Sequence, residues 1–127
     1  NLPEKQIKAV FELRAACLSG YTPDLFGCHI CGSQNPIRFD LRAGQLECEN
    51  CRSPESNGIR LPVTPAVLEA MRYICLCDPK RIFSFQLGAE TLALLANLTE
   101  AYLATQLERG FSTLDFYKSL YIGEKYV

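Results

Sequence analysis

The sequence lacks the features of three common classes of protein. None of its apolar runs approaches the roughly 18 residues that indicate a membrane-spanning helix. Its first ten residues, NLPEKQIKAV, lack the basic and then apolar segments of a secretion signal. Basic residues form no tail or stripe along the sequence. The chain has 13 Lys and Arg and 14 Asp and Glu, which gives a net charge of −1. Because proteins that grip the DNA backbone need clustered basic residues, we expect this chain alone to bind phosphate poorly.

What is present is typical of a single soluble domain. The chain has 127 residues, of which 48% are hydrophobic and 21% charged, the proportions of an ordinary globular protein. With neither a membrane span nor a secretion signal, we expect a cytoplasmic protein. The first residue is Asn rather than Met, so we also expect the chain to be a fragment or a trimmed product.

Seven cysteines are the main chemical signal, and four of them form two C-x2-C pairs: Cys28, Cys31, Cys48 and Cys51. Sixteen residues separate the pairs, which is the spacing of a four-thiolate zinc site. A disulfide scaffold is the weaker alternative, because the number is odd and no export signal is visible. Thiol redox chemistry is weaker still, because a thioredoxin-like motif needs a βαβ context that neither pair has. The sequence therefore predicts one Zn²⁺ ion.

Four cysteine ligands predict a structural ion and no enzyme. Catalytic zinc keeps one coordination position open for water, and four thiolates close the shell. His29, the only histidine, lies inside the first pair and is expected to be an exposed residue rather than a ligand. Cys17, Cys75 and Cys77 fall on or beside apolar helical faces and are interpreted as buried free thiols.

Helical patterns flank the cysteine segment and predict a mainly α fold, a bundle of about four helices with an inserted zinc ribbon. The expected helices cover residues 3–19, 64–78, 88–109 and 112–121, and the ribbon, with a small β-hairpin, covers 28–60. Thr64-Pro65 is a typical helix start. Gly20 is expected to cap the first helix in the left-handed conformation, and Gly110 to end the third.

The first helix has an apolar stripe and a basic group. The stripe is expected to be core and consists of Ile7, Val10, Phe11, Leu13, Cys17 and Leu18. Lys5, Lys8 and Arg14 are interpreted as the solvated side of an amphipathic helix. The functional alternative is a cationic rim beside an apolar groove that takes an acidic peptide tail.

The order of these motifs resembles the second domain of the bacterial recombination mediator RecO. It is carried by Phe11-Glu12-Leu13, by the run from Gly20 to Leu25, and by Cys28-x2-Cys31-Gly32, and it continues through Ala43-Gly44 and Cys48-x2-Cys51. The resemblance implies the helical, zinc-binding C-terminal domain, without the OB-fold domain that precedes it in the family. It also implies docking of RecR and of the acidic, Phe-ended tail of single-stranded DNA-binding protein, with support for DNA annealing and RecA loading.

Two other functions remain open at this stage. A nucleic-acid-binding zinc ribbon of another family would present Arg38, Arg42, Arg52 and Arg60 to phosphate. A zinc-dependent enzyme would need an open ligand position. The preferred hypothesis is a non-enzymatic interaction module of a DNA-repair mediator.

Overall fold

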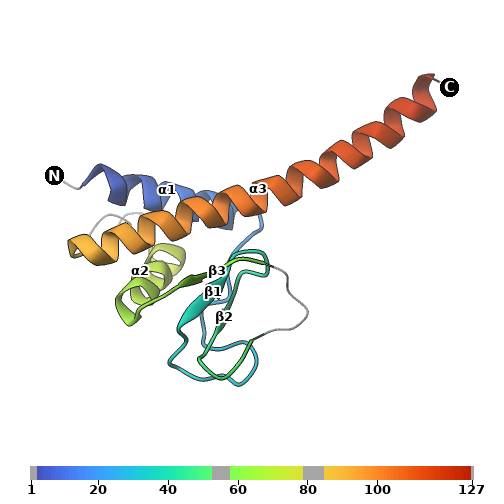
Figure 1. Ribbon diagram of the computed structural model, residues 1–127. Helices are drawn as coiled ribbons and strands as arrows, with labels where there is room; N and C mark the ends of the chain where they lie inside the picture. The colour runs from blue at the N-terminus through green and yellow to red at the C-terminus, as the bar shows by residue number, and fades with distance from the viewer. Residues whose placement is uncertain (1–2, 53–57, 79–84, 127) are drawn as a thin grey trace.

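The computed structural model describes residues 3–52, 58–78 and 85–126, with the backbone only from 110 onward. Within these ranges the protein is mainly helical, with three helices and one three-stranded antiparallel sheet. The elements follow in the order α1 (Glu4–Leu18), β1 (Arg38–Asp40), β2 (Gln45–Glu47), β3 (Arg60–Pro62), α2 (Pro65–Leu76) and α3 (Ala89–Tyr126). Figure 1 shows the three helices packed together, with the sheet and its loops below them.

The helix ends follow the capping residues that the sequence contains. At the end of α1, the Gly20 N–H donates to the Cys17 carbonyl at 3.1 Å and the Tyr21 N–H to the Ala16 carbonyl at 2.8 Å. This is a Schellman motif, and it needs the positive φ of 91° that Gly20 adopts. At the start of α2, the Thr64 Oγ1 accepts from the Val67 N–H at 3.2 Å. Both predicted caps are confirmed.

The buried face of α1 differs from the predicted one. The residues of α1 that are buried are Gln6, Ala9, Val10, Leu13 and Ala16. In contrast, Ile7, Phe11 and Leu18 are 37%, 65% and 82% exposed. Ala9 and Ala16 are small, so they let another helix approach α1 closely. They are therefore buried, although alanine contributes only weakly to a hydrophobic sequence pattern. The expectation that the whole apolar stripe is core was therefore wrong.

The last helix is continuous where two helices were predicted. α3 runs through Gly110 and Ser112 without a break and has 38 residues, which makes it about 57 Å long. A glycine inside a helix costs only about 1 kcal/mol relative to alanine, so Gly110 does not force an end. In Figure 1 the second half of α3 extends beyond the other elements.

The zinc-ribbon segment contains the predicted hairpin and one additional strand. β1 pairs with β2 in the register Phe39 to Leu46, and Gly44, with a φ of 67°, lies in the turn between them. β3 pairs with the other edge of β1, which gives the order β2-β1-β3. The strand β3 was not predicted from the sequence. Part of the predicted ribbon, residues 53–57, lies outside the described residues.

The sheet and the helices share one core. Phe39 of β1 has no exposed surface and meets Tyr102 of α3 edge to face, with ring centroids 5.3 Å apart. The Tyr102 hydroxyl donates to the Tyr21 carbonyl, and Gln106 Nε2 donates to the Leu41 carbonyl at 2.8 Å. The ribbon is therefore fixed to α3 by both apolar and polar contacts.

None of the helices in the described ranges combines the length and the apolar character that crossing a membrane requires.

Candidate metal centre

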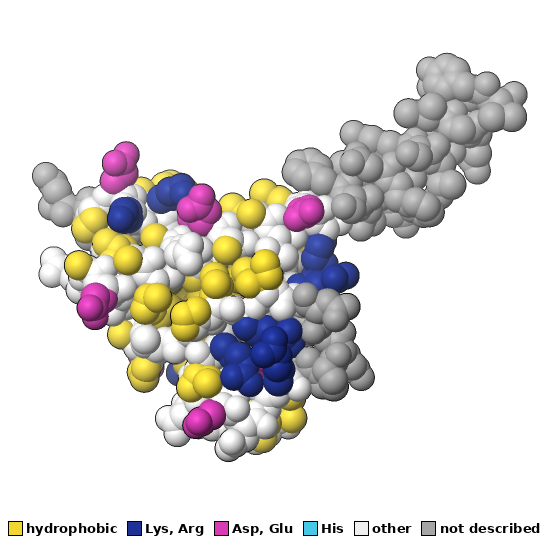
Figure 2. All heavy atoms as spheres, in the orientation of Figure 1, with side chains coloured by type: hydrophobic (Ala, Val, Ile, Leu, Met, Phe, Trp, Pro, Cys, Tyr) yellow, Lys and Arg dark blue, Asp and Glu magenta, His cyan; other side chains and the backbone are white. Residues whose placement is uncertain are grey.

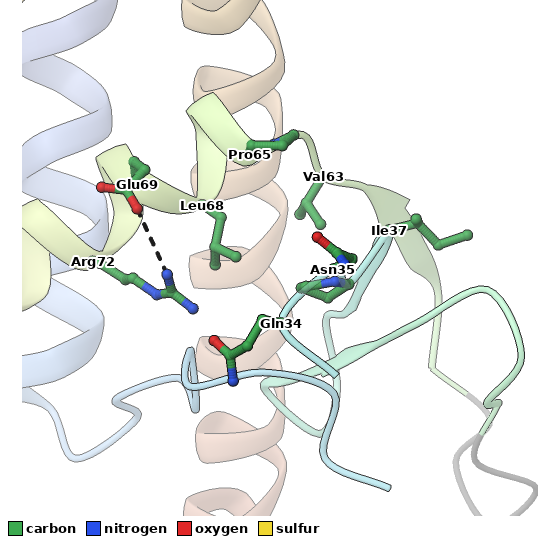
Figure 3. A pocket seen from close by; sticks show the side chains of 9 residues that line it. Gln34, Asn35, Ile37, Val63, Pro65, Leu68, Glu69 and Arg72 are labelled. Atoms are coloured by element: carbon green, nitrogen blue, oxygen red, sulfur yellow. Dashed lines mark ion pairs between the residues drawn. The ribbon is translucent and has the colours of Figure 1, made fainter. Parts of the chain in front are cut away.

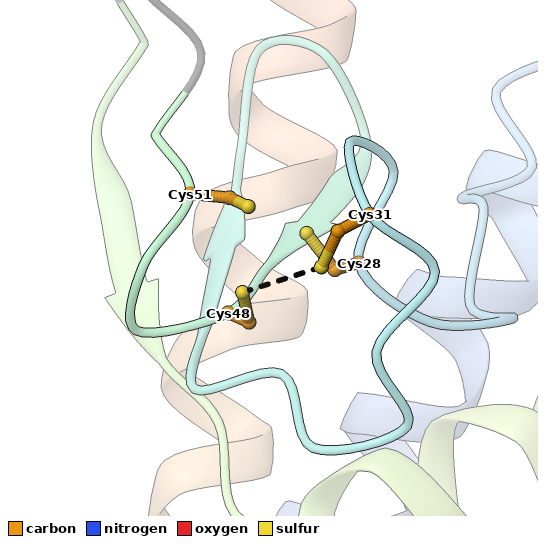
Figure 4. A group of neighbouring side chains, drawn as sticks. All are labelled: Cys28, Cys31, Cys48 and Cys51. Carbon is orange, nitrogen blue, oxygen red and sulfur yellow. Dashed lines mark hydrogen bonds between the residues drawn. The ribbon is translucent and has the colours of Figure 1, made fainter.

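The four cysteines of the two C-x2-C pairs come together as predicted. Their Sγ atoms all lie within 4.8 Å of one another, and those of Cys31 and Cys48 are 3.6 Å apart. Figure 4 shows the four side chains converging from two loops. Sulfurs that surround Zn²⁺ tetrahedrally at about 2.3 Å lie about 3.8 Å from one another. The observed separation therefore fits a zinc ion.

Backbone hydrogen bonds fix both cysteine turns. In the first turn, the Gly32 N–H donates to the Cys28 carbonyl at 2.8 Å and the Cys28 N–H to the Ser33 carbonyl at 2.9 Å. Cys28 also forms a parallel bridge with Leu46 of β2, which brings the first turn beside the second. Gly27 has a φ of 135°, and a Cβ there would lie 2.9 Å from the Ser33 carbonyl oxygen. Only glycine fits at that position.

The thiols influence one another's ionisation. Burial raises the pKa of Cys28, but backbone N–H groups of Cys31, Cys48 and Ile30 outweigh it and lower the pKa to about 6. A hydrogen bond with the Cys48 thiol is the main cause that raises the pKa of Cys51 to about 12. Adjacent like charges oppose ionisation, so a divalent cation is needed to hold four thiolates together. The donor set, four sulfurs, suits a soft or borderline metal such as zinc.

Beneath the second turn lies a buried ionic network. Glu47 has no exposed side-chain surface, and its Oε1 lies 3.0 Å from Arg38 Nε and 3.3 Å from Arg60 Nε. Arg38 Nη2 also donates to the Cys51 carbonyl at 2.6 Å. Arg38 therefore joins the backbone of a cysteine turn to the sheet. This carboxylate was not identified from the sequence, because Leu46-Glu47-Cys48 suggests only an ordinary strand.

His29 lies outside the metal centre. Its side chain is partly exposed, and it is not among the residues of the four-cysteine group, the one such group in the described parts of the chain. Its backbone N–H donates to the Leu46 carbonyl at 2.9 Å. His29 therefore contributes through its backbone, which aligns the first cysteine turn with β2.

The three basic residues of α1 are in different environments. Lys5 is exposed. Lys8 lies 3.2 Å from a Glu100 carboxylate oxygen and 3.6 Å from one of Glu12, and the hydrogen bond with Glu100 is the main cause that raises its pKa. Arg14 is partly buried, and its Nη1 donates to the Ile74 carbonyl of α2 at 3.4 Å. The structure therefore does not place the three on one cationic rim.

A small pocket lies between α2 and the ribbon. It has a volume of about 240 Å³, and its walls include Ile37, Val63 and Leu68. Figure 3 shows these side chains, with the ion pair of Glu69 and Arg72 at one side. Small-molecule sites usually measure about 300–1,000 Å³. This pocket is thus better suited to one side chain of a partner than to a cofactor.

The visible surface divides into two regions. In Figure 2, hydrophobic side chains are spread over the helical part, and a group of Lys and Arg side chains lies over the sheet. The segment that forms the sheet and the metal centre contains four arginines, of which Arg42 and Arg52 are exposed. The other two, Arg38 and Arg60, face Glu47.

Comparison with known proteins gives a consistent result. A family profile described as recombination protein O C terminal matches residues 1–115. A protein named DNA repair protein RecO from Acetivibrio thermocellus is 30% identical over 118 residues, which cover 91% of this chain and 46% of that protein. The RecO of Symbiobacterium thermophilum is 28% identical over 123 residues, covering 93% and 47%. The RecO of Rubrobacter xylanophilus is 43% identical over 72 residues, covering 52% and 27%. No solved structure matches this chain significantly.

Proposed function

The chain belongs to the recombination protein O C-terminal family, and from this membership we propose that it is a non-catalytic interaction module of a DNA repair and recombination mediator. Its relatives carry the name DNA repair protein RecO. The chain spans about half the length of those relatives, 46% and 47% of two of them. We propose that the protein supports DNA annealing and RecA loading in the cytoplasm, and that this chain is its docking part.

The closed sulfur site is the observation that carries the non-catalytic assignment. Four Sγ atoms within 4.8 Å of one another leave no coordination position for water, which hydrolytic zinc needs. We propose that the ion is Zn²⁺ and that it holds the ribbon in shape. Cys28, Cys31, Cys48 and Cys51 would be its ligands, and the ion would supply folding free energy rather than chemistry.

The docking surface is proposed on α1. Ile7, Phe11 and Leu18 fall within about 40° of one another around a helix of 3.6 residues per turn, and all three are exposed. An exposed row of this kind marks an interaction site more often than an isolated exposed residue does. Lys8 lies about 60° from Phe11 around the same helix, so the row with this one cation beside it suits the acidic, Phe-ended tail of single-stranded DNA-binding protein. RecR is the second proposed partner.

A peptide titration tests this proposal. A labelled acidic peptide that ends in Phe should bind at micromolar concentration, and the affinity should fall as salt screens the charges. A peptide of equal charge that ends in Ala is the matched ligand control. Phe11→Ala in the row should weaken binding several-fold, whereas Arg52→Gln on the ribbon should leave it unchanged. No heat and no shifted resonances at low salt would reject the proposal. Resonance shifts confined to Leu68 and Val63 would instead assign the peptide-binding site to the pocket between α2 and the ribbon.

A DNA-binding ribbon is the second candidate, favoured by the basic group over the sheet in Figure 2. It predicts an affinity for single-stranded DNA that falls steeply with the logarithm of the salt concentration. Arg42→Gln with Arg52→Gln should then abolish that affinity. An unchanged affinity in this double variant would exclude the ribbon as the DNA contact.

A further inference from the structure

Two cysteines outside the metal centre lie in contact. The Sγ atoms of Cys17, near the end of α1, and Cys75, near the end of α2, are 3.5 Å apart although the residues are 58 positions apart in the chain. Both side chains are partly exposed and both thiols are free. A disulfide has an S–S distance of about 2.05 Å, so the two sulfurs need to move together by only about 1.5 Å.

The surroundings hold this pair in place and favour an ionised Cys17. Arg14 lies one helical turn before Cys17 and donates to the Ile74 carbonyl, which precedes Cys75. The hydrogen bond between the two sulfurs is the main cause that lowers the pKa of Cys17 to about 6, and the charge of Arg14 acts in the same direction. The same hydrogen bond raises the pKa of Cys75. A thiolate beside a thiol is the arrangement from which a disulfide forms readily.

We propose that a peroxide oxidises Cys17 and Cys75 to a reversible disulfide. This bond joins α1 to α2. The inference does not depend on the partners proposed above, because it rests on the packing of two helices and not on the α1 surface or the metal centre.

The chemistry balances with hydrogen peroxide as the oxidant. The Cys17 thiolate attacks one peroxide oxygen, and the O–O bond breaks to leave Cys17 as the sulfenic acid. The departing hydroxide takes up the proton that Cys17 released on ionising and becomes the first water. The Cys75 sulfur then attacks the Cys17 sulfur, the S–O bond breaks, and water departs with the proton from Cys75. Two thiols thus lose two electrons, and one peroxide becomes two waters.

The bond would close a loop that contains the whole ribbon. Because a cross-link removes more chain entropy from the unfolded state as the enclosed loop lengthens, oxidation should raise the midpoint of thermal unfolding by at least about 5 °C.

Peptide mapping of the zinc-loaded chain tests the proposal. After mild peroxide treatment and alkylation, non-reducing mass spectrometry should find Cys17 linked to Cys75, and dithiothreitol should reverse the link. Trypsin alone leaves Cys17 on one peptide with Cys28 and Cys31, because residues 15–37 contain no Lys or Arg. Chymotrypsin cleavage after Tyr21 separates them. A chromogenic chelator measures zinc release. Zinc release reports oxidation of the four ribbon cysteines separately from formation of the Cys17–Cys75 link.

Three variants make the test specific. Cys77→Ser removes the thiol that shares a peptide with Cys75, and it should form the link at the wild-type rate. Cys75→Ser should leave Cys17 to accumulate as sulfenic and sulfinic acid and should abolish the rise in the unfolding midpoint. Cys17→Ser should keep Cys75 alkylatable throughout. The proposal is overturned if no Cys17–Cys75 peptide forms before zinc is lost, or if Cys75→Ser does not change the fate of Cys17.

Discussion

Glu47 is a carboxylate buried in the sheet, with guanidinium groups on two sides. Its side chain has no exposed surface, and that of Arg60 is 8% exposed. Removing a charge from water costs several kcal/mol, and here the cost is offset by the two ion pairs and their hydrogen bonds. Loss of Glu47 therefore removes the nearest carboxylate from both arginines, although Arg60 keeps Asp40 at 3.7 Å. At this scale the stability of the ribbon depends on a charge balance as well as on the metal.

We predict that Glu47→Gln lowers the free energy of unfolding by about 3 kcal/mol, because it keeps the side-chain shape and leaves two arginines facing a neutral amide. Urea denaturation followed by circular dichroism measures the loss. Glu49→Gln, two residues further along and exposed, is the matched control and should change stability by less than about 0.5 kcal/mol. Equal stability of the two variants would contradict the role assigned to Glu47.

At the scale of elements, α3 is the feature that departs most from the expected bundle. It is one helix of 38 residues with Gly110 in its interior. A glycine in a continuous helix and a glycine that caps a helix respond oppositely to alanine. In the helix interior, alanine is favoured by about 1 kcal/mol, whereas a capping glycine has a positive φ that alanine adopts only with strain.

Gly110→Ala is accordingly expected to stabilise the protein by up to about 1 kcal/mol and to raise its helical circular dichroism signal. Ala104→Gly, at an exposed position of the same helix, should have the opposite effect of similar size. A loss of stability in Gly110→Ala would mean that the chain ends its helix at this residue.

At the scale of the whole molecule, the ribbon is part of the main core and not an appendage. Phe39, Leu41 and Leu46 belong to the same buried cluster as Leu95 and Leu98 of α3. Polar contacts from Gln106 and Arg109 to the Arg42 carbonyl, at 3.1 and 2.6 Å, strengthen the join. A disturbance of the metal centre should therefore reach the helices.

We predict that complete metal removal, or Cys48→Ser, makes residues 28–60 sensitive to proteases and also lowers the thermal midpoint of the helices. The reason is that metal binding supplies folding free energy to the ribbon, and the ribbon supplies buried residues to the core. Limited proteolysis and scanning calorimetry measure the two effects. Cys77→Ser, outside the four-cysteine group, should show neither. Unchanged proteolysis of that segment after metal removal would refute the prediction.

The sequence was sufficient to predict the features that depend on local chemistry. The two C-x2-C turns, the Thr64 cap and the Gly20 cap each follow from neighbouring residues, and each was confirmed. Features that depend on distant residues were missed. β3 contains Arg60 and Pro62, which carry little strand signal, and it exists because β1 offers a free edge. The pairing of Cys17 with Cys75 depends on how two helices pack, which periodicity does not encode.

The meeting of Tyr102 with Phe39 and Tyr21 has a practical consequence. The chain contains no tryptophan, so its near-ultraviolet absorption and dichroism come mostly from tyrosine. Tyr102 is 2% exposed and stacks edge to face on a residue of the sheet while its hydroxyl is bound to the loop after α1. The near-ultraviolet dichroism of Tyr102 therefore reports whether the ribbon and the helices are packed together, with no added dye or label.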